Sequence, residues 1–174
     1  MSDFDRRAFL GTLALAGAAA APLAASTPVA ASANLQLADI KKEADTACLY
    51  HVDYGNPERF AQTLNNISNH YAAYGADPFA IQLAIVAHSG GIKFFLDNLS
   101  GTHWEKETLD PSFNTKLDAL SKNGLKVYLC SLTFERNKLS HDRARQEDYI
   151  AFVPSGVATV GALQAKGFGY LKVW

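Results

Sequence analysis

The side chains that could carry out chemistry fall in four short segments, and each segment follows or closes an apolar run. They supply one thiol, two imidazoles, a carboxylate, three hydroxyls and a glycine: Cys130, His51, His88, Asp53, Ser89, Ser131, Ser155 and Gly156. A thiolate is a strong nucleophile, and imidazoles move protons or bind metal ions. We therefore predict one site with Cys130 as its reactive group and the other seven residues as binding residues.

Cys130 is the candidate nucleophile. Thr133 could cap a helix that starts at Phe134, and the free N–H groups of a helix start favour a nearby thiolate. The alternative is that Cys130 is a small buried apolar residue, as free cysteines often are. Cys48 lies in the middle of an apolar run and is predicted to be an inert core residue. A disulfide would need the two Cα atoms within about 7 Å of each other, and we expect both thiols to be free.

The two histidines allow a second interpretation. His51, His88 and Cys130 together offer donor atoms that suit zinc or copper. Asp53 could orient His51, or it could bond backbone N–H groups in the turn that follows. The simplest alternative for either histidine is a hydrogen-bonded residue that shapes its loop. The remaining histidines belong to no pattern and are predicted to lie on the surface: His70, His103 and His141.

Other chemistries lack their motifs. Ser89 precedes Gly90-Gly91, but the first glycine of the Gly-x-Ser-x-Gly nucleophile turn is missing. The same glycine pair has no third glycine at the spacing of a dinucleotide-binding loop. No motif names a cofactor. The formal net charge of −1 gives no general attraction to nucleic acid or to anionic lipid, so no nucleic-acid partner is expected.

The elements that must position these residues alternate between apolar runs and amphipathic helical patterns. Strands are predicted at 46–52, 81–87, 125–129, 149–153 and 170–174, and helices at 57–74, 92–96, 113–122, 134–146 and 156–166. Unbroken apolar strands separated by helices indicate an α/β fold in three layers, with a mainly parallel sheet of about five strands, of the flavodoxin-like type. Because parallel strands end at one edge of the sheet, the four segments should converge on one crevice.

The first residues resemble an export leader. Arg6-Arg7 precedes an alanine- and glycine-rich stretch, and Ala31-Ser32-Ala33 offers the small residues at which a signal peptidase cuts. We predict a twin-arginine signal over 1–33, with 29–31 as the alternative cleavage motif, a linker over 34–45 and one domain over 46–174. The protein would then be periplasmic. The leader is too weakly apolar to be a good membrane anchor, and a cytoplasmic protein with an alanine-rich head is the other alternative.

Several motifs resemble the DsrE/DsrF-like family. They are Tyr50-His51-Val52-Asp53-Tyr54-Gly55, Ile85-Val86-Ala87-His88-Ser89-Gly90-Gly91, Asn123-Gly124-Leu125-Lys126-Val127-Tyr128-Leu129-Cys130, Val153-Pro154-Ser155-Gly156-Val157 and the closing 163–172 segment. They occur in the family's order over the whole predicted domain. The resemblance implies a parallel sheet between helices and a homo-oligomer. In the best-understood branch it also implies a carrier that holds sulfane sulfur as a persulfide on one cysteine.

Cys130 stands where that branch places its cysteine. The resemblance therefore implies a sulfur-relay component that works with donor and acceptor proteins, rather than a stand-alone enzyme, and that needs no cofactor beyond the bound sulfur. A periplasmic protein that binds a metal or small ligand through His51, His88 and Cys130 is one alternative. A non-catalytic oligomer subunit is the other.

The segment after Gly90-Gly91 suggests where an oligomer could form. It places four large apolar residues in one short helix: Ile92, Phe94, Phe95 and Leu96. Because one buried face of a short helix does not easily take up four such groups, we predict that part of this helix packs in an interface between copies. The alternative is that the core of the domain buries all four.

Overall fold

The computed structural model describes residues 32–77 and 79–174. The predicted leader lies almost entirely outside this part of the chain. The elements, in chain order, are β1 (Ala33–Asn34), β2 (Thr46–Val52), α1 (Pro57–Ala73), β3 (Ile81–Ala87), the 3₁₀ helix η1 (Ser89–Phe95), α2 (Ser112–Ser121), β4 (Lys126–Cys130), α3 (Ser131–Arg136), the 3₁₀ helix η2 (His141–Arg143), β5 (Ile150–Val153), α4 (Gly156–Ala165) and β6 (Gly169–Leu171).

Local sequence signals account for the most regular of these elements. The apolar runs 46–52 and 81–87 form β2 and β3 with the predicted bounds. Helix α1 begins as predicted, because the Asn56 side chain accepts a hydrogen bond from the Arg59 N–H and Pro57 takes the first helical position. Gly75, at φ 68°, follows the end of the helix in the left-handed conformation that glycine adopts at little cost.

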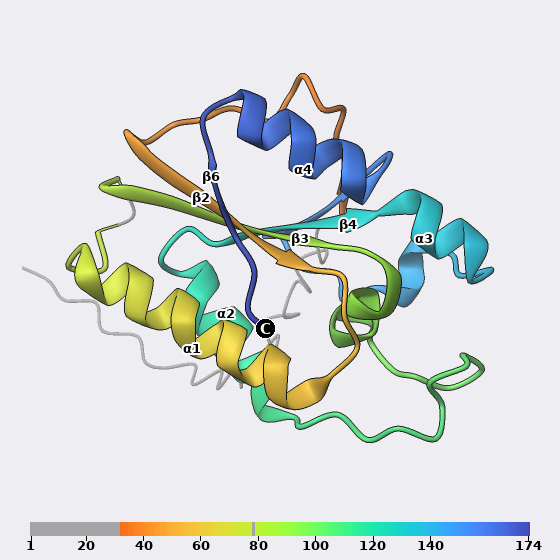
Figure 1. The fold of residues 1–174 in the computed structure, drawn as a ribbon. Helices are drawn as coiled ribbons and strands as arrows, with labels where there is room; N and C mark the ends of the chain where they lie inside the picture. The colour runs from red at the N-terminus through yellow and green to blue at the C-terminus, as the bar shows by residue number, and fades with distance from the viewer. Residues whose placement is uncertain (1–31, 78) are drawn as a thin grey trace, which may run out of the picture.

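The sheet has six strands, all parallel, in the order β1-β5-β4-β3-β2-β6. From β2 to β5 the chain advances in one direction across the sheet, and α1 and α2 cover one face. After β5 it must return past three strands to place β6 beside β2. Since such crossovers are right-handed in either direction, the reversal puts α4 on the opposite face, and Figure 1 shows α4 on one side of the sheet with α1 and α2 on the other. The three-layer fold is confirmed.

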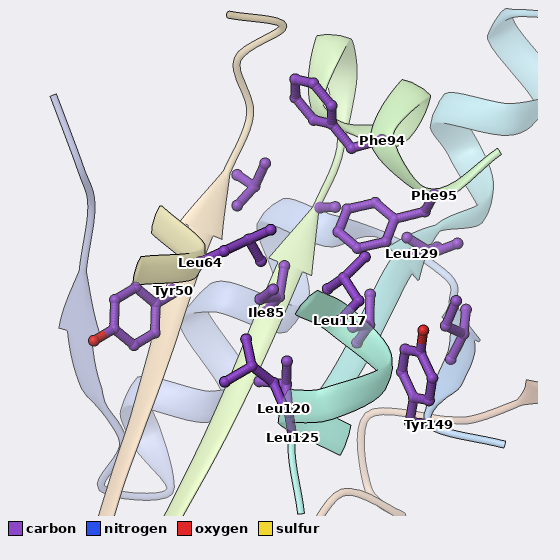
Figure 2. Packing of buried hydrophobic residues seen from close by; sticks show 14 of the residues in the cluster. Tyr50, Leu64, Ile85, Phe94, Phe95, Leu117, Leu120, Leu125, Leu129 and Tyr149 are labelled. Atoms are coloured by element: carbon purple, nitrogen blue, oxygen red, sulfur yellow. The ribbon is translucent and has the colours of Figure 1, made fainter. Parts of the chain in front are cut away.

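Each face of the sheet has its own apolar core. The larger core lies under α1, α2 and η1 and includes Tyr50, Ile85 and Leu129 from the strands (Figure 2). The smaller core lies under α4 and includes Leu49, Val86 and Leu163. Successive residues of a strand point to opposite faces, so the parity of a residue number within a strand decides which core the side chain joins.

Two predictions about the elements differ from the structure. The sheet has a sixth strand, β1, which pairs with β5 through Ala33↔Ala151, so the predicted linker contains part of an edge strand. The predicted helix over 134–146 is wrong. Helix α3 begins directly after Cys130 and ends at Arg136, and Lys138 follows at φ 56°. The chain then runs beside η1, where the Arg145 N–H donates to the Phe95 carbonyl, and these long-range backbone bonds take the place of a continued helix.

The proposed interface helix is also corrected. Ile92, Phe94, Phe95 and Leu96 are all at most 5% exposed, and the rings of Phe94 and Phe60 stack 4.1 Å apart within the larger core. The four side chains are therefore taken up by the domain itself, and η1 offers no apolar face to a second copy. The homo-oligomer that the family resemblance implies stays a prediction without this surface. Within residues 32–77 and 79–174, none of the helices is both long and apolar enough to cross a membrane.

Candidate functional site

The strands deliver three reactive side chains to one face of the sheet at one edge. Leu49, Val86 and Tyr128 belong to the smaller core under α4. His51, His88 and Cys130 each lie two residues further along the same strand or just past its end, so their side chains are on that face as well. All three lie at or just beyond the carboxyl ends of β2, β3 and β4, which are neighbours in the sheet. These three side chains therefore come to the same edge and face of the sheet for a simple reason: neighbouring strands are parallel, and side chains alternate between the faces along each strand.

The two histidines are in direct contact. His51 Nε2 and His88 Nε2 lie 2.7 Å apart, a hydrogen-bond distance. The other nitrogen of each ring also has a partner: His51 Nδ1 lies 2.8 Å from the Tyr170 hydroxyl, and His88 Nδ1 lies 3.0 Å from Ser89 Oγ. The four side chains thus form one continuous chain of hydrogen bonds that begins at Tyr170, on the exposed edge strand.

This chain can be satisfied in two ways with both rings neutral. Tyr170 can donate to His51, His51 to His88 and His88 to Ser89, or each of the three hydrogen bonds can run in the opposite direction. Moving one proton along each bond converts one arrangement into the other when the Tyr170 oxygen takes up a proton from solvent and Ser89 Oγ releases one to solvent. The pair can also carry one added proton and keep its contact. It cannot carry two, because both Nε2 atoms would then be donors facing each other.

The surroundings favour the neutral rings. Burial lowers the pKa of His88, and the positive charge of Lys172 lowers it further, which together outweigh the opposite effect of Asp53. Burial is also the main cause that lowers the pKa of His51, with repulsion from His88 and Lys172 adding to it. Taking an imidazolium out of water costs free energy. The lowered pKa values favour a neutral pair near neutral pH, and neutral imidazoles have the lone pairs that a proton or a metal ion can take up.

Asp53 is the anionic group of the site. Its Oδ2 accepts a hydrogen bond of 2.7 Å from Lys172 Nζ and lies 4.0 Å from His51 Nε2. Burial raises the pKa of Asp53, but the hydrogen bond from Lys172 and the nearby positive charges outweigh burial and leave the pKa below its ordinary value. The carboxylate is thus ionised at neutral pH and faces the histidine pair.

Cys130 lies at the point where the chain changes faces. After β4 the chain turns into α3, whose Phe134 packs in the core under α1 and α2, whereas after β5 it turns into α4 on the opposite face. Ligand crevices of open α/β sheets lie where neighbouring strands send their connections to opposite faces. Cys130 is 5% exposed, so its thiol is nearly covered.

Gly156 lies close to both Cys130 and His88. It is the first residue of α4, and a Cβ atom there would lie 2.9 Å from His88 Cβ and Cδ2 and 3.2 Å from Cys130 Cβ. Only a residue without a side chain lets the start of α4 approach both groups so closely. Cys130 and His88 therefore pack against the same glycine, beneath the first turn of α4.

Cys48 lies apart from this site. It faces the α1 side of the sheet, with Tyr50 and Val52, and its Sγ approaches the Gly169 backbone. Both cysteines are free, as expected, and their position on opposite faces explains why. Burial raises the pKa of the Cys48 thiol, although a backbone hydrogen bond at Gly169 opposes it. Cys48 is consequently a weak nucleophile at neutral pH.

The predicted serines differ in role. Ser89 belongs to the hydrogen-bond chain and is held at φ 51°, a left-handed conformation, with its N–H donating to Thr133 Oγ1. Ser155 is the N-cap of α4, because its Oγ accepts a hydrogen bond from the Ala158 N–H. Ser131 begins α3 and is half-buried. Within the described residues, Ser89 is the one serine of these three that forms a hydrogen bond with a histidine of the site.

One group of side chains in the described part of the chain is arranged as metal ligands usually are. His51, Asp53 and His88 each offer a ligand atom, and these atoms all lie within 4.8 Å of one another. The two histidines were expected in such a set. The third possible ligand of this group is Asp53, whereas the sequence predicts Cys130 as the third ligand.

Sequence reasoning missed two residues of the site, Tyr170 and Lys172. Both come from β6 or directly follow it, and β6 lies beside β2 through the register Leu49↔Tyr170. A final strand was expected, but its neighbour in the sheet was not. No local signal could have found them, because the right-handed crossover rule links the face that carries α4 to the direction of the return and fixes neither of them.

Comparisons with known proteins agree with this fold. The model of the DsrE/DsrF-like family matches residues 30–173. A solved structure, that of the protein of unknown function MTH1491 from Methanobacterium thermoautotrophicum, is similar with a TM-score of 0.60 at 20% sequence identity, over 74% of this chain and 99% of that chain. At this identity the likeness supports the fold alone. Among curated proteins, no significant match is found.

Proposed function

The chain belongs to the DsrE/DsrF-like family, and from that premise we propose that it is a sulfur-relay-type carrier that holds sulfane sulfur as a persulfide on Cys130. The observation that carries the proposal is the position of this thiol: it ends a central strand at the point where the chain changes faces, and it packs against Gly156 together with His88. Family resemblance supports the type of chemistry, and the geometry supports the residue.

The transfer step needs a thiolate and an electrophilic sulfur. The Cys130 thiolate attacks the terminal sulfur of a polysulfide, one S–S bond forms on Cys130, and the S–S bond next to that sulfur in the donor breaks. The donor leaves one sulfur shorter and takes up the bond's electron pair as an anion, so no external oxidant or reductant is needed. The thiol first loses its proton to water or buffer, because only the thiolate attacks well.

Burial of the thiol suits a carrier. A persulfide is more reactive than a thiol, and a sulfur atom held at a site that is 5% exposed is shielded from bulk solvent. Two apolar residues close in sequence to Cys130 and Gly156, Leu132 on α3 and Val157 on α4, are 40% and 68% exposed. Exposed apolar side chains near the thiol suit transient docking of a donor or acceptor protein.

We also propose that the protein works in the periplasm. The twin arginines Arg6-Arg7 and the small residues at 31–33 support export. The two possible cleavage motifs differ in outcome: cleavage after Ala33 would remove one residue of β1, whereas cleavage after Ala31 would keep both. Ser32 donates its N–H to Gln146 Oε1, which favours the cut that retains Ser32.

Sulfur loading tests the carrier directly. The purified chain is incubated with inorganic polysulfide, freed of excess reagent and measured by intact mass. One added sulfur atom is expected on the unmodified chain and on Cys48→Ser, and none on Cys130→Ser. Iodoacetamide before loading should label Cys130 first and abolish uptake. Uptake on Cys48, or resistance of both folded thiols to sulfur and to alkylation, would refute the carrier.

A further inference from the structure

The histidine pair and Asp53 form a second chemical centre that sulfur transfer on Cys130 does not require. Ligand atoms from these three residues lie within 4.8 Å of one another. We propose that His51, His88 and Asp53 bind one divalent metal ion of the zinc type. This centre is separate from the proposed carrier function, because none of its three ligands is the thiol.

The first argument is the orientation of the rings. In protein metal sites the histidine nitrogen that does not bind the metal is usually held by a hydrogen bond, which fixes the direction of the ligand nitrogen. Here Tyr170 holds Nδ1 of His51, Ser89 holds Nδ1 of His88, and the two Nε2 atoms face each other. The supporting hydrogen bonds are thus already in place.

The second argument is the distance between the donor atoms. Two nitrogens bound to one tetrahedral zinc ion at bond lengths of about 2.0–2.1 Å are about 3.3 Å apart. The observed separation is 2.7 Å, so an ion replaces the shared proton when the rings move apart by about half an ångström, judged from those zinc bond lengths. The rings meet at an interplanar angle of 45° and are both half-buried, and such a shift needs no change in the strands.

The third argument is charge. Asp53 lies 4.0 Å from His51 Nε2 and supplies a hard oxygen donor, which completes two imidazoles and a carboxylate. This set suits zinc with one coordination position left for water or substrate. Lys172 neutralises the same carboxylate oxygen at 2.7 Å. The ammonium competes with a metal ion for this carboxylate, and its Nζ lies 4.9 Å from the ring of exposed Trp174, where an ammonium displaced from Asp53 keeps a favourable contact.

Competition by Lys172 gives the proposal a distinctive signature. Removing the ammonium with Lys172→Met should strengthen metal binding several-fold, since the ion no longer displaces a cation. A merely adventitious histidine site on the surface would not respond in this way. Tyr170→Phe removes the hydrogen bond that orients His51 and should weaken binding by roughly tenfold, as is usual for partners that hold a ligand in place.

Titration of the full chain with zinc chloride tests the site. One zinc per chain is expected, with affinity lowered at least roughly tenfold in His51→Gln, His88→Gln and Asp53→Asn. His70→Gln is the matched control, since His70 is a half-buried histidine that bonds Tyr50, and it should bind as the unmodified chain does. Circular dichroism melts of each variant without metal establish that it folds.

Cobalt(II) then identifies the ligands. A site of two nitrogens and an oxygen gives the d–d bands of the ion without a thiolate charge-transfer band, and Cys130→Ser should leave the spectrum unchanged. A thiolate band that disappears in Cys130→Ser would assign the metal to the thiol and overturn the proposal. So would binding that His88→Gln does not weaken, or that His70→Gln weakens equally. Sulfur loading is measured in the same variants. Because it depends on Cys130, whereas metal binding depends on His51, His88 and Asp53, failure of one proposal can be told from failure of the other.

Discussion

Gly156→Ala tests whether the start of α4 must touch the thiol and the histidine pair. The added Cβ would lie 2.9 Å from His88 Cβ and Cδ2, a separation that real Cβ atoms essentially never have, and 3.2 Å from Cys130 Cβ. The β carbons of His88 and Cys130 are fixed to the ends of two central strands, so they cannot swing aside as the end of a long side chain can. Either α4 or both strand ends must therefore move.

The size of the effect follows from two opposing terms. Overpacking of a well-packed site costs about 1–3 kcal/mol, whereas alanine stabilises a helix by up to about 1 kcal/mol relative to glycine. Gly161 of the same helix separates the terms, because a Cβ there meets nothing within 4 Å. Gly161→Ala should stabilise the domain by about 0.5–1 kcal/mol, and Gly156→Ala should be less stable than Gly161→Ala by about 1–3 kcal/mol.

Urea unfolding followed by circular dichroism measures both variants, and iodoacetamide labelling of the folded proteins measures the site. Gly156→Ala should label Cys130 several-fold faster, since the start of α4 that covers the thiol must move away from it, whereas Gly161→Ala should label it at the normal rate. If Gly156→Ala gains stability as Gly161→Ala does and labels normally, the contact between α4, His88 and Cys130 does not exist and the site is wrongly assembled.

Two further predictions concern pH and export. The pKa values of His51 and His88 are lowered in the folded protein, so on acidification these histidines take up protons in the unfolded chain before they do so in the folded one. The stability that the neutral histidines give to the folded state is therefore fully present above about pH 6.5, and it is lost as the pH falls through that value towards the lowered pKa values. Urea unfolding should therefore give a smaller free energy at about pH 5.5 than at about pH 7.5, with a weaker dependence in the His51→Gln/His88→Gln double variant, and a free energy that stays constant or rises on acidification would contradict this. Replacement of Arg6-Arg7 by two lysines should leave unprocessed protein in the cytoplasm, as fractionation and amino-terminal sequencing would detect, and normal processing of that variant would rule out the twin-arginine route.

The strands and most helices could be predicted because their signals are local. An unbroken apolar run such as 83–87 can only be stable when both faces are covered, which is what a central parallel strand provides. Strand β1 has no such signal, because two residues carry no pattern and are ordered only by pairing with β5. The prediction of a helix over 134–146 is wrong for the opposite reason, because here a local signal is present and a long-range contact overrides it. Its pattern is compatible with a helix, but the backbone of Arg145 finds a partner in Phe95, far away in sequence.

The site was predictable to the same extent. That His51, His88 and Cys130 lie at one edge and on one face of the sheet follows from strand ends and from the alternation of side chains along each strand, which are local properties. That the two imidazoles touch, that Asp53 rather than Cys130 stands with them, and that Lys172 holds Asp53 depend on turn conformation and on the last strand. No spacing in the sequence encodes these contacts.

A single topological event accounts for the part of the site that the sequence did not reveal. Because the chain reverses direction after β5, α4 must cross the far face of the sheet, and its first residue, Gly156, then covers His88 and Cys130. The same return places β6 beside β2, where Tyr170 and Lys172 reach the histidine pair and Asp53. Strands β2, β3 and β4 thus supply the reactive groups, and the residues from Gly156 onward cover them, orient them and balance their charge. Both proposed chemistries, sulfur on the thiol and metal on the imidazoles, depend on that closing segment, and so the two centres should lose their function together when α4 or β6 is displaced.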